Sequence, residues 1–249
     1  IGTKEINESG ATTVSELLAQ RAGVSTSVNV DGGAIFNMLG LDSRYILILK
    51  NNQPVTGRFN NRVDLDQVST NRIKKIEITK GPGSAVYGTD AMGGVINIIT
   101  EDPGELPSLG LSYRASSFGG TPREIYSEPV NSIVRGSIAL PIKTVTISND
   151  ITYQQFTKGQ QFEYISADQI DKLNLNTDLN WRRSNHEARI SHQYFGQKDQ
   201  GATRLSNGTV LYNNATAIDR SQLTLTHSWK IKKTSTVHQT IRKANYIRE

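Results

Sequence analysis

The hydrophobic pattern changes character part-way along the chain. In residues 1–103, apolar side chains come in short runs, of which Tyr45 to Leu49 is unbroken and predicts a strand buried on both faces. In residues 104–249, apolar and polar side chains alternate; at 173–181 every odd position is Leu, Thr or Trp, and every even position is Asn or Asp. The two patterns predict a mixed α+β unit followed by an all-β unit of antiparallel strands.

The α+β unit is expected to open with a helix. Thr13 is a favourable N-cap, and Glu16 three residues later completes a capping box. Arg21 would lie in the last turn of this helix. Its buried stripe would consist of Val14, Leu17 and Leu18. Further along, Asn51 and Asn52 tolerate the left-handed conformation, so they predict a type I′ hairpin turn directly after the buried strand.

The all-β unit has connections of two kinds. Short turns are predicted around residues 140–143, 182–185 and 231–234, and long polar excursions around residues 118–130, 158–171 and 199–218. The two kinds take strict turns, and Trp181 and Trp229 each precede a short turn. Outer-membrane barrels combine alternating strands, unequal connections and aromatic residues at the strand ends. We therefore expect about seven transmembrane strands.

A glycine-rich loop lies between two β-branched runs near the end of the α+β unit. The segment GPGSAVYG imitates a phosphate-binding loop, but Thr89 and Asp90 follow its last glycine, where a Walker loop requires Lys and Ser or Thr. A strand also follows, whereas a phosphate-binding loop opens a helix. The pattern indicates a tight packing loop between two strands, in which we expect no room for side chains at Gly81, Gly88, Gly93 and Gly94; a positive φ angle at Gly93, if the loop requires one, would add to the cost of a side chain there.

The same segment resembles the C-terminal part of the plug domain of TonB-dependent outer-membrane receptors. That family carries an E-x-x-x-GP segment, a YG-x-x-A segment and a GGVINI strand in this order and spacing. The motif residues that match, and that we expect to be structural, are Glu77, Gly81, Pro82, Tyr87, Gly88, Gly93, Gly94 and Asn97. Ala91, Val95, Ile96 and Ile98 match as well.

The resemblance implies a plug domain at residues 1–103 and the N-terminal part of a transmembrane β-barrel at residues 104–249. Barrels with a plugged lumen have about twenty-two strands, so the seven expected here would be about a third of one. The resemblance further implies the outer membrane of a Gram-negative bacterium, contact with its lipid, and TonB as a partner. The family binds TonB through a segment ahead of the plug, which the sequence given does not contain.

In the family, the loop at the place of residues 55–72 belongs to the plug apex, where the ligand lands. The candidate ligand-binding residues are Phe36, Asn37, Arg58, Phe59, Asn60, Asn61 and Arg62. Their cationic and aromatic side chains suit an anionic or aryl ligand. An ordinary solvated loop explains the residues 58–62 equally well, since most loops bind nothing.

Composition excludes several other classes of protein. The chain has no cysteine and no apolar run of about 18 residues, which excludes a disulfide framework and a transmembrane helix. The first residues do not show the charged, apolar and small-residue regions of a signal peptide, so we expect either that an export signal was removed or that the sequence starts part-way through its gene. Residues 104–249 carry eighteen basic and twelve acidic side chains, but these are spread along the strands rather than gathered into a nucleic-acid-binding patch. Basic clusters at Arg182-Arg183 and at Lys230 to Lys233 indicate a solvated or headgroup-facing edge.

No residue pattern indicates catalysis, a resident metal or a cofactor. The histidines His186, His192, His227 and His238 fall in alternating strands, and the first two lie about 20 Å apart along one strand, so we expect scattered polar residues rather than a metal site. The resemblance implies a non-enzymatic receptor for energised import of a small metal chelate, such as a ferric siderophore or cobalamin. The alternative is a non-transporting outer-membrane binding protein or adhesin with a plug-like domain.

Overall fold

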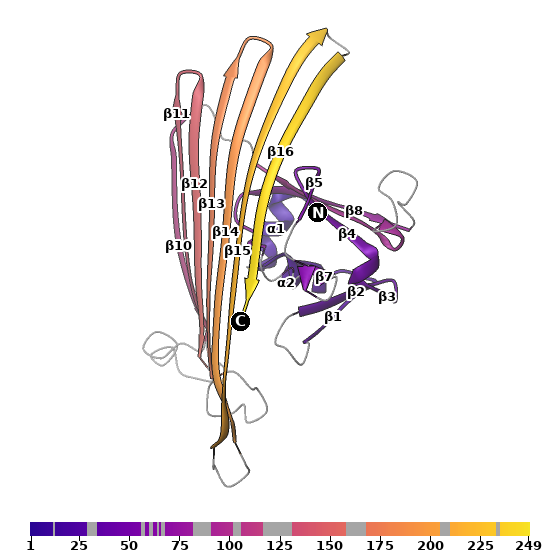
Figure 1. Ribbon diagram of the computed structural model, residues 1–249, viewed down its shortest axis with the longest axis vertical. Helices are drawn as coiled ribbons and strands as arrows, with labels where there is room; N and C mark the ends of the chain where they lie inside the picture. The colour runs from indigo at the N-terminus through magenta and orange to yellow at the C-terminus, as the bar shows by residue number, and fades with distance from the viewer. Residues whose placement is uncertain are drawn as a thin grey trace. The chain divides into compact units, whose positions relative to one another are not determined.

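The computed structural model divides the chain into two compact units, Ile1–Asp102 and Pro103–Glu249, beside the boundary expected after residue 103. Each unit is described by itself, and Figure 1 gives the labels of their elements. The structure describes residues 1–11, 13–28, 34–55, 58–59, 62–63, 65, 68–81, 91–101, 106–116, 131–157, 168–204, 210–232 and 235–249.

The predicted helix is α2 (Val14–Ala19), and its cap is confirmed. Thr13 is the N-cap residue, and its Oγ1 accepts a hydrogen bond from the backbone N–H of Glu16 at 3.2 Å. The predicted stripe of Val14, Leu17 and Leu18 is fully buried. The helix ends at Ala19, so the placement of Arg21 in its last turn is wrong.

A second helix, α1 (Thr3–Ser9), precedes it and was not predicted. It is seven residues long and ends at Gly10, which has a φ angle of 68°. Its one buried side chain is Ile6, so it shows no apolar stripe that sequence periodicity could detect. Arg21, which follows α2, pairs with Glu5 of α1 at 2.5 Å, and this contact joins the two helical segments.

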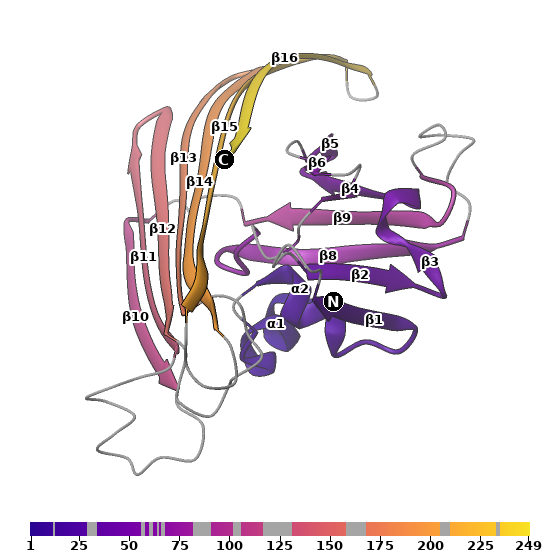
Figure 2. The same ribbon diagram turned by 60° about the horizontal axis from the view of Figure 1, so that its bottom comes forward.

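The strands of the first unit form small sheets. Strands β1 (Val24–Val28), β2 (Ala34–Met38) and β3 (Leu41–Asp42) make an antiparallel sheet, which a 3-10 helix (Ser43–Tyr45) follows. A second sheet has the order β5 (Gln53–Pro54), β4 (Ile46–Lys50), β9 (Gly94–Thr100), β8 (Ile73–Lys80). The short strands β6 (Arg58–Phe59) and β7 (Arg62–Val63) pair with each other. Figure 2 shows β9 beside β8 in the second sheet.

The predicted buried strand is β4. It pairs with β9 in parallel and with β5 in antiparallel direction, and its residues Ile46 to Leu49 are at most 5% exposed. Asn51 and Asn52 connect β4 to β5 with φ angles of 49° and 63°, which confirms the predicted type I′ turn. The core combines residues of both helices, β2, β4, β8 and β9. It includes Ile6, Leu17, Leu18, Phe36, Met38, Ile46, Ile48, Ile76, Ile96 and Ile98.

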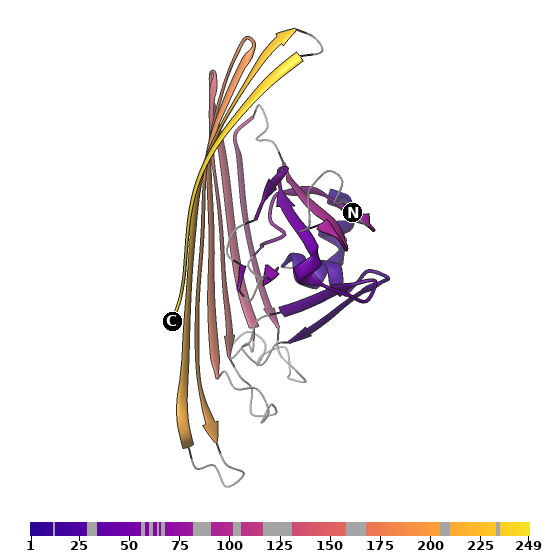
Figure 3. The ribbon, with the colours of Figure 1, turned by 45° about the vertical axis from the view of Figure 1, so that its right-hand side comes forward.

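The second unit is one antiparallel sheet, and its described residues form the seven strands that were predicted. The strands follow one another in sequence order: β10 (Ser108–Ser116), β11 (Asn131–Ile142), β12 (Val145–Thr157), β13 (Gln169–Arg183), β14 (His186–Arg204), β15 (Val210–Lys232) and β16 (Ser235–Arg248). Figure 3 shows that this sheet is curved along its length.

The connections of this sheet alternate in length, with one correction. The short connections follow β11, β13 and β15, and in Figure 1 the turns after β11 and β13 lie at the upper end of the sheet. The predicted long excursion at residues 199–218 is wrong, because β14 continues to Arg204 and β15 begins at Val210. Polar side chains do not end a strand, since the ladder pairs backbone groups; Asp199 still lies opposite Thr216.

The two faces of the sheet differ as the alternation predicted. Leu173, Leu175, Leu179 and Trp181 share one face, and Asn174, Asn176, Asp178 and Asn180 share the other. Register extends the first face across the sheet. We call it the apolar face; its exposed large side chains are Leu109, Leu111, Tyr113, Val134, Ile138, Leu140, Ile142, Ile147, Ile151, Tyr153, Leu179, Ile190, Leu223, Leu225, Trp229, Val237, Ile241 and Ile247.

Candidate functional site

Two residues of the plug-like motif, Glu77 and Asn97, meet across strands β8 and β9. Asn97 is 8% exposed, and its Nδ2 donates hydrogen bonds to Asn52 Oδ1 at 2.7 Å and to Glu77 Oε2 at 3.4 Å. The backbone N–H of Asn52 donates to Asn97 Oδ1 at 3.2 Å. Asn97, which lies on β9, therefore connects β8 and the turn between β4 and β5, and this role is structural.

The carboxylate of Glu77 is held in its charged form. Lys75, two residues earlier on the same face of β8, donates a hydrogen bond to Glu77 Oε1 at 2.6 Å. This hydrogen bond, with a smaller contribution from Asn97, keeps the pKa of the Glu77 carboxyl below its usual value of 4.5.

The glycines of the motif are required for different reasons, either a positive φ angle or a lack of space for a side chain. Gly94, the first residue of β9, has a φ angle of 143°, and a Cβ there would lie 2.5 Å from the backbone oxygen of Thr79. Gly81 has a φ angle of 103° in open space. Gly93 has no positive φ angle, but the expected lack of room is confirmed, because a Cβ there would lie 3.2 Å from Tyr45 O and from Leu41 Cδ1; its own N–H donates to Tyr45 O at 2.7 Å. Pro82, Tyr87 and Gly88 lie outside the described residues.

The candidate ligand residues fall on two elements. The backbone of Arg58 and Phe59 forms β6, which pairs in antiparallel direction with β7, so that Phe59 lies opposite Arg62. Asn60 and Asn61 lie outside the described residues. Phe36 is 1% exposed and packs in the core through β2, which argues against its predicted ligand contact because no surface is left for a ligand. Asn37, its neighbour on β2, is partly exposed.

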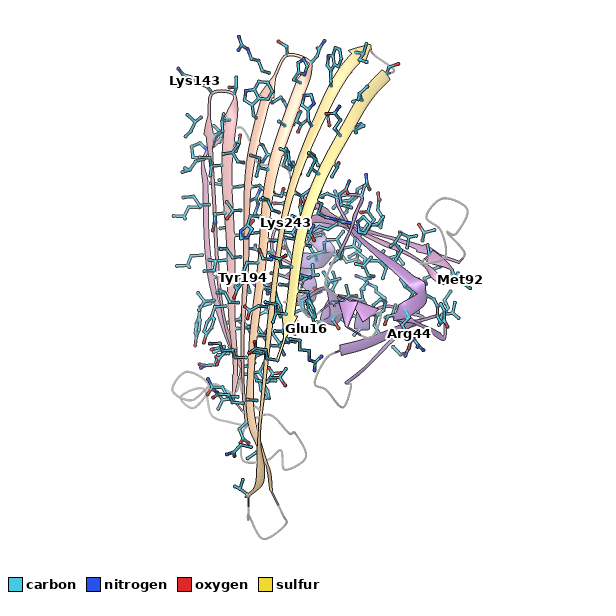
Figure 4. All side chains as sticks on the ribbon, in the orientation of Figure 1. Glu16, Arg44, Met92, Lys143, Tyr194 and Lys243 are labelled. Carbon is cyan, nitrogen blue, oxygen red and sulfur yellow. The ribbon has the colours of Figure 1, made fainter. Side chains whose placement is uncertain are left out.

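The apolar face has an aromatic border at each end. Trp181 and Trp229 lie near the short turns, as predicted. Toward the other end, Tyr153 donates its hydroxyl hydrogen bond to Asp171 at 2.8 Å, and Tyr194 donates to Asp219 at 2.6 Å. Figure 4 labels Tyr194 on β14 and Lys143 at the turn that follows β11.

The separation of the two borders comes close to the height of the apolar band in outer-membrane barrels but is somewhat smaller. Tyr153 lies opposite Leu173, and Trp181 follows eight residues along β13. Eight residues span about 26 Å along a strand, or about 20 Å in height at the tilt of about 40° that barrel strands adopt. The apolar band of outer-membrane barrels is about 25 Å tall. The tyrosine border was missed because cross-strand pairing is not visible in the sequence.

Two of the four histidines come together on the apolar face. His186 Nδ1 and His227 Nε2 lie 3.2 Å apart on neighbouring strands, and the His186 ring also lies 5.6 Å from the Trp229 ring. The expectation of scattered histidines is therefore wrong for this pair, because the register between β14 and β15, which the sequence does not show, brings the two residues together. Within the described residues, no group of three or more metal-ligating side chains of His, Cys, Asp or Glu comes together.

The opposite face of the sheet carries polar contacts between strands. Ser191 of β14 donates to Asp178 of β13, and the guanidinium of Arg220 lies 5.8 Å from the ring centre of Phe195.

Helices in the described part of the chain are too short and too polar to cross a membrane.

Comparison with known proteins supports this architecture. Residues 1–95 match the family model described as TonB-dependent Receptor Plug Domain. The whole chain is similar in fold to a mutant of the ferric enterobactin receptor PfeA from Pseudomonas aeruginosa in complex with enterobactin (TM-score 0.74, 17% identity, 99% of this chain and 40% of that one).

Two further solved structures have the same fold. One is the siderophore receptor PiuA from Acinetobacter baumannii (TM-score 0.76, 14% identity, 100% of this chain and 36% of that one). The other is the FrpB iron transporter from Neisseria meningitidis (TM-score 0.75, 14% identity, 100% and 40%). The chain thus spans about two fifths of the length of these proteins. Residues 1–95 thus match the plug domain of TonB-dependent receptors, and the chain as a whole shares its fold with these solved structures.

Proposed function

We propose that the protein is a receptor in the outer membrane of a Gram-negative bacterium that imports a ferric siderophore, with energy delivered through TonB. The observation that carries the proposal is the inverted sheet of the second unit, whose large apolar side chains are exposed while its polar side chains share the other face. A water-soluble sheet buries its apolar face, whereas a sheet in lipid exposes it. In this proposal the cargo passes through without chemical change, so the protein is not an enzyme.

The choice of cargo rests on charge and aromatic character. The hairpin at the predicted plug apex carries Arg58, Phe59 and Arg62. Cationic and aromatic side chains suit an anionic aryl chelate. The solved relatives are named as receptors or transporters of siderophores, enterobactin or iron. We therefore favour a ferric siderophore over cobalamin.

The membrane placement is tested with spin labels on the intact protein in a lipid bilayer. Labels are placed singly at Leu175 and Asn176, which are neighbours on opposite faces of β13, and at Leu225 and Thr226 on β15. We expect contact with lipid-soluble relaxation agents at Leu175 and Leu225, and contact with water-soluble agents at Asn176 and Thr226. Water contact at all four positions would overturn the membrane placement.

The import function is tested by uptake of radioactive iron siderophore into cells that carry the intact protein. Uptake should require TonB, and Arg58→Ala with Arg62→Ala should weaken siderophore binding while leaving assembly unchanged. Lys74→Ala, an exposed cation on β8, is the matched control and should bind as the wild type does. Binding without TonB-dependent uptake would favour the alternative of a non-transporting binding protein or adhesin.

A further inference from the structure

Two rows of side chains cross the apolar face beside the short turns. The first row is Arg183, His186, Trp229 and Val237, and the second is Trp181, Ala188, His227 and Gln239; within each row the residues lie opposite one another on strands β13 to β16. We call the following group the rim patch: Trp181, Arg183, His186, Ala188, His227 and Trp229.

The two histidines of the rim patch share a hydrogen bond. The ring centroids of His186 and His227 lie 5.4 Å apart with 11° between the ring planes, and their nearest nitrogens are 3.2 Å apart. The centroid separation equals the nitrogen distance plus the two ring radii, so the rings meet edge to edge, and one donates its N–H to the lone pair of the other. Two nitrogens bound to one tetrahedral zinc ion would be about 3.4 Å apart, so the nitrogen distance alone does not exclude a metal. The two nitrogens point at each other, however, which leaves no room for an ion between them, and among the described residues no third His, Cys, Asp or Glu ligand gathers beside them. The pair therefore fits a shared proton better than a metal ion.

The charges that face this pair are of one sign. From β13, Arg183 lies opposite His186; from β16, the facing residues are the uncharged Val237 and Gln239. On β14 and β15 the nearest residues on this face are Ala188 and Trp229, which do not titrate. The nearby ion pair of Arg182 and Glu187, at 3.0 Å, projects from the opposite face. A proton taken up by the pair would thus place a second positive charge beside Arg183, which favours an anion as a third partner.

The depth of the patch indicates which anion can reach it. Trp181 borders an apolar band that begins at the tyrosines about 20 Å away, so the rim patch lies where lipid headgroups begin. Ala188 stands between Trp181 and His227 in its row; it has the smallest side chain of the rim patch and is partly exposed. Turn residues at the same end include Lys143, which follows β11 (Figure 4).

We propose that the rim patch binds the phosphate of an anionic phospholipid, and that the histidine pair takes up a proton as it does so. Arg183 and the protonated pair supply two positive charges, while Trp181 and Trp229 contact the acyl chains beneath the headgroup. Because histidine changes charge between about pH 5 and 8, binding should tighten as the pH falls through that range. This inference rests on the membrane placement proposed above.

The test measures quenching of Trp229 fluorescence by brominated lipids in nanodiscs that contain the intact protein. The Trp229 signal is the part of the emission lost in Trp229→Phe. We expect brominated phosphatidylglycerol to quench it more than brominated phosphatidylcholine, with a preference about fivefold stronger near pH 5.5 than near pH 8, as one added charge at an anionic surface provides.

Substitutions separate the contribution of the histidine pair from that of Arg183. His186→Gln combined with His227→Gln should keep part of the preference for phosphatidylglycerol but lose its pH dependence, and Arg183→Gln should weaken the preference at both pH values. His192→Gln is the matched control: it is a histidine on the same face of β14, bound to Ser221 at 3.1 Å, and should behave as the wild type does.

Two results would overturn the inference. One is equal quenching by the two lipids at both pH values, and the other is a pH dependence that persists in the double histidine variant. Either result with lipid contact retained at Leu175 overturns the rim patch alone, whereas water contact at Leu175 overturns the membrane placement itself.

Discussion

Replacement of Gly94 by alanine should loosen the central sheet of the plug. Two separate effects meet at this residue. Its φ angle of 143° lies in a region that L-residues rarely occupy, and holding a residue there costs about 1–3 kcal/mol. The new Cβ would also lie 2.5 Å from the backbone oxygen of Thr79 and 2.4 Å from Met38 Cε. The methionine can move, but the oxygen belongs to the paired strand β8, and forcing the two strands apart adds about 1–3 kcal/mol.

The expected loss is therefore about 2–6 kcal/mol, a large part of the 5–15 kcal/mol that stabilises a typical domain. Two other glycines separate the contributions. Gly81→Ala places its Cβ in open space at a φ angle of 103°, so it should show the backbone strain alone. Gly93→Ala brings its Cβ to 3.2 Å from Tyr45 O without a positive φ, so it should show crowding alone and cost about 1 kcal/mol.

Hydrogen exchange on the intact protein measures these losses locally. The amides of Ile96 and Ile98 on β9 report the free energy of opening the sheet, and amides of β13 serve as an internal reference in the other unit. The expected order of loss is Gly94→Ala first, then Gly81→Ala and Gly93→Ala. Wild-type protection of β9 in Gly94→Ala would refute the reasoning, because neither the strained angle nor the close oxygen would then be real.

Three further predictions concern other contacts. Asn97→Ala should lower the opening free energy of β4 and β9 by about 1–3 kcal/mol, since it leaves the polar groups of the hairpin turn without their buried partner; exchange at the level of the wild type would contradict this. Glu77 has a folded-state pKa below 4.5, so its stabilisation is present above that pH and is lost as the pH falls through the folded value; Glu77→Gln should flatten the decline of plug stability toward acid, measured by exchange at several pH values. Gly196→Ala should displace Tyr194 from Asp219, because its Cβ would lie 2.7 Å from the Tyr194 hydroxyl, and thermal unfolding should show a loss of about 1–2 kcal/mol.

Local chemistry in the sequence was sufficient for much of the fold. The cap at Thr13, the type I′ turn at Asn51 and Asn52, and the alternation around Leu175 were all predicted and confirmed. Each depends on residues that are close together in the chain, where backbone preference and side-chain period act directly. The recognition of the plug motif also needed only residues 73–100.

The features that the sequence did not reveal depend instead on residues that are far apart in the chain. The length of β14 and β15 is decided by backbone pairing between strands, which polar side chains do not prevent. Phe36 was a candidate ligand contact until packing placed it in the core. The restriction at Gly93 comes from Tyr45, which lies far away in sequence.

The register between strands is what the sequence by itself did not determine. Period-two alternation says which face a side chain takes, but not which residue of the next strand it meets, since that depends on turn lengths and on pairing along the whole ladder. The meeting of His186 with His227 across 41 positions, of Tyr194 with Asp219, and of Asn97 with Asn52 was decided by that pairing. The sequence thus determined the class of fold and its membrane-like pattern, and the tertiary structure decided which polar groups act together.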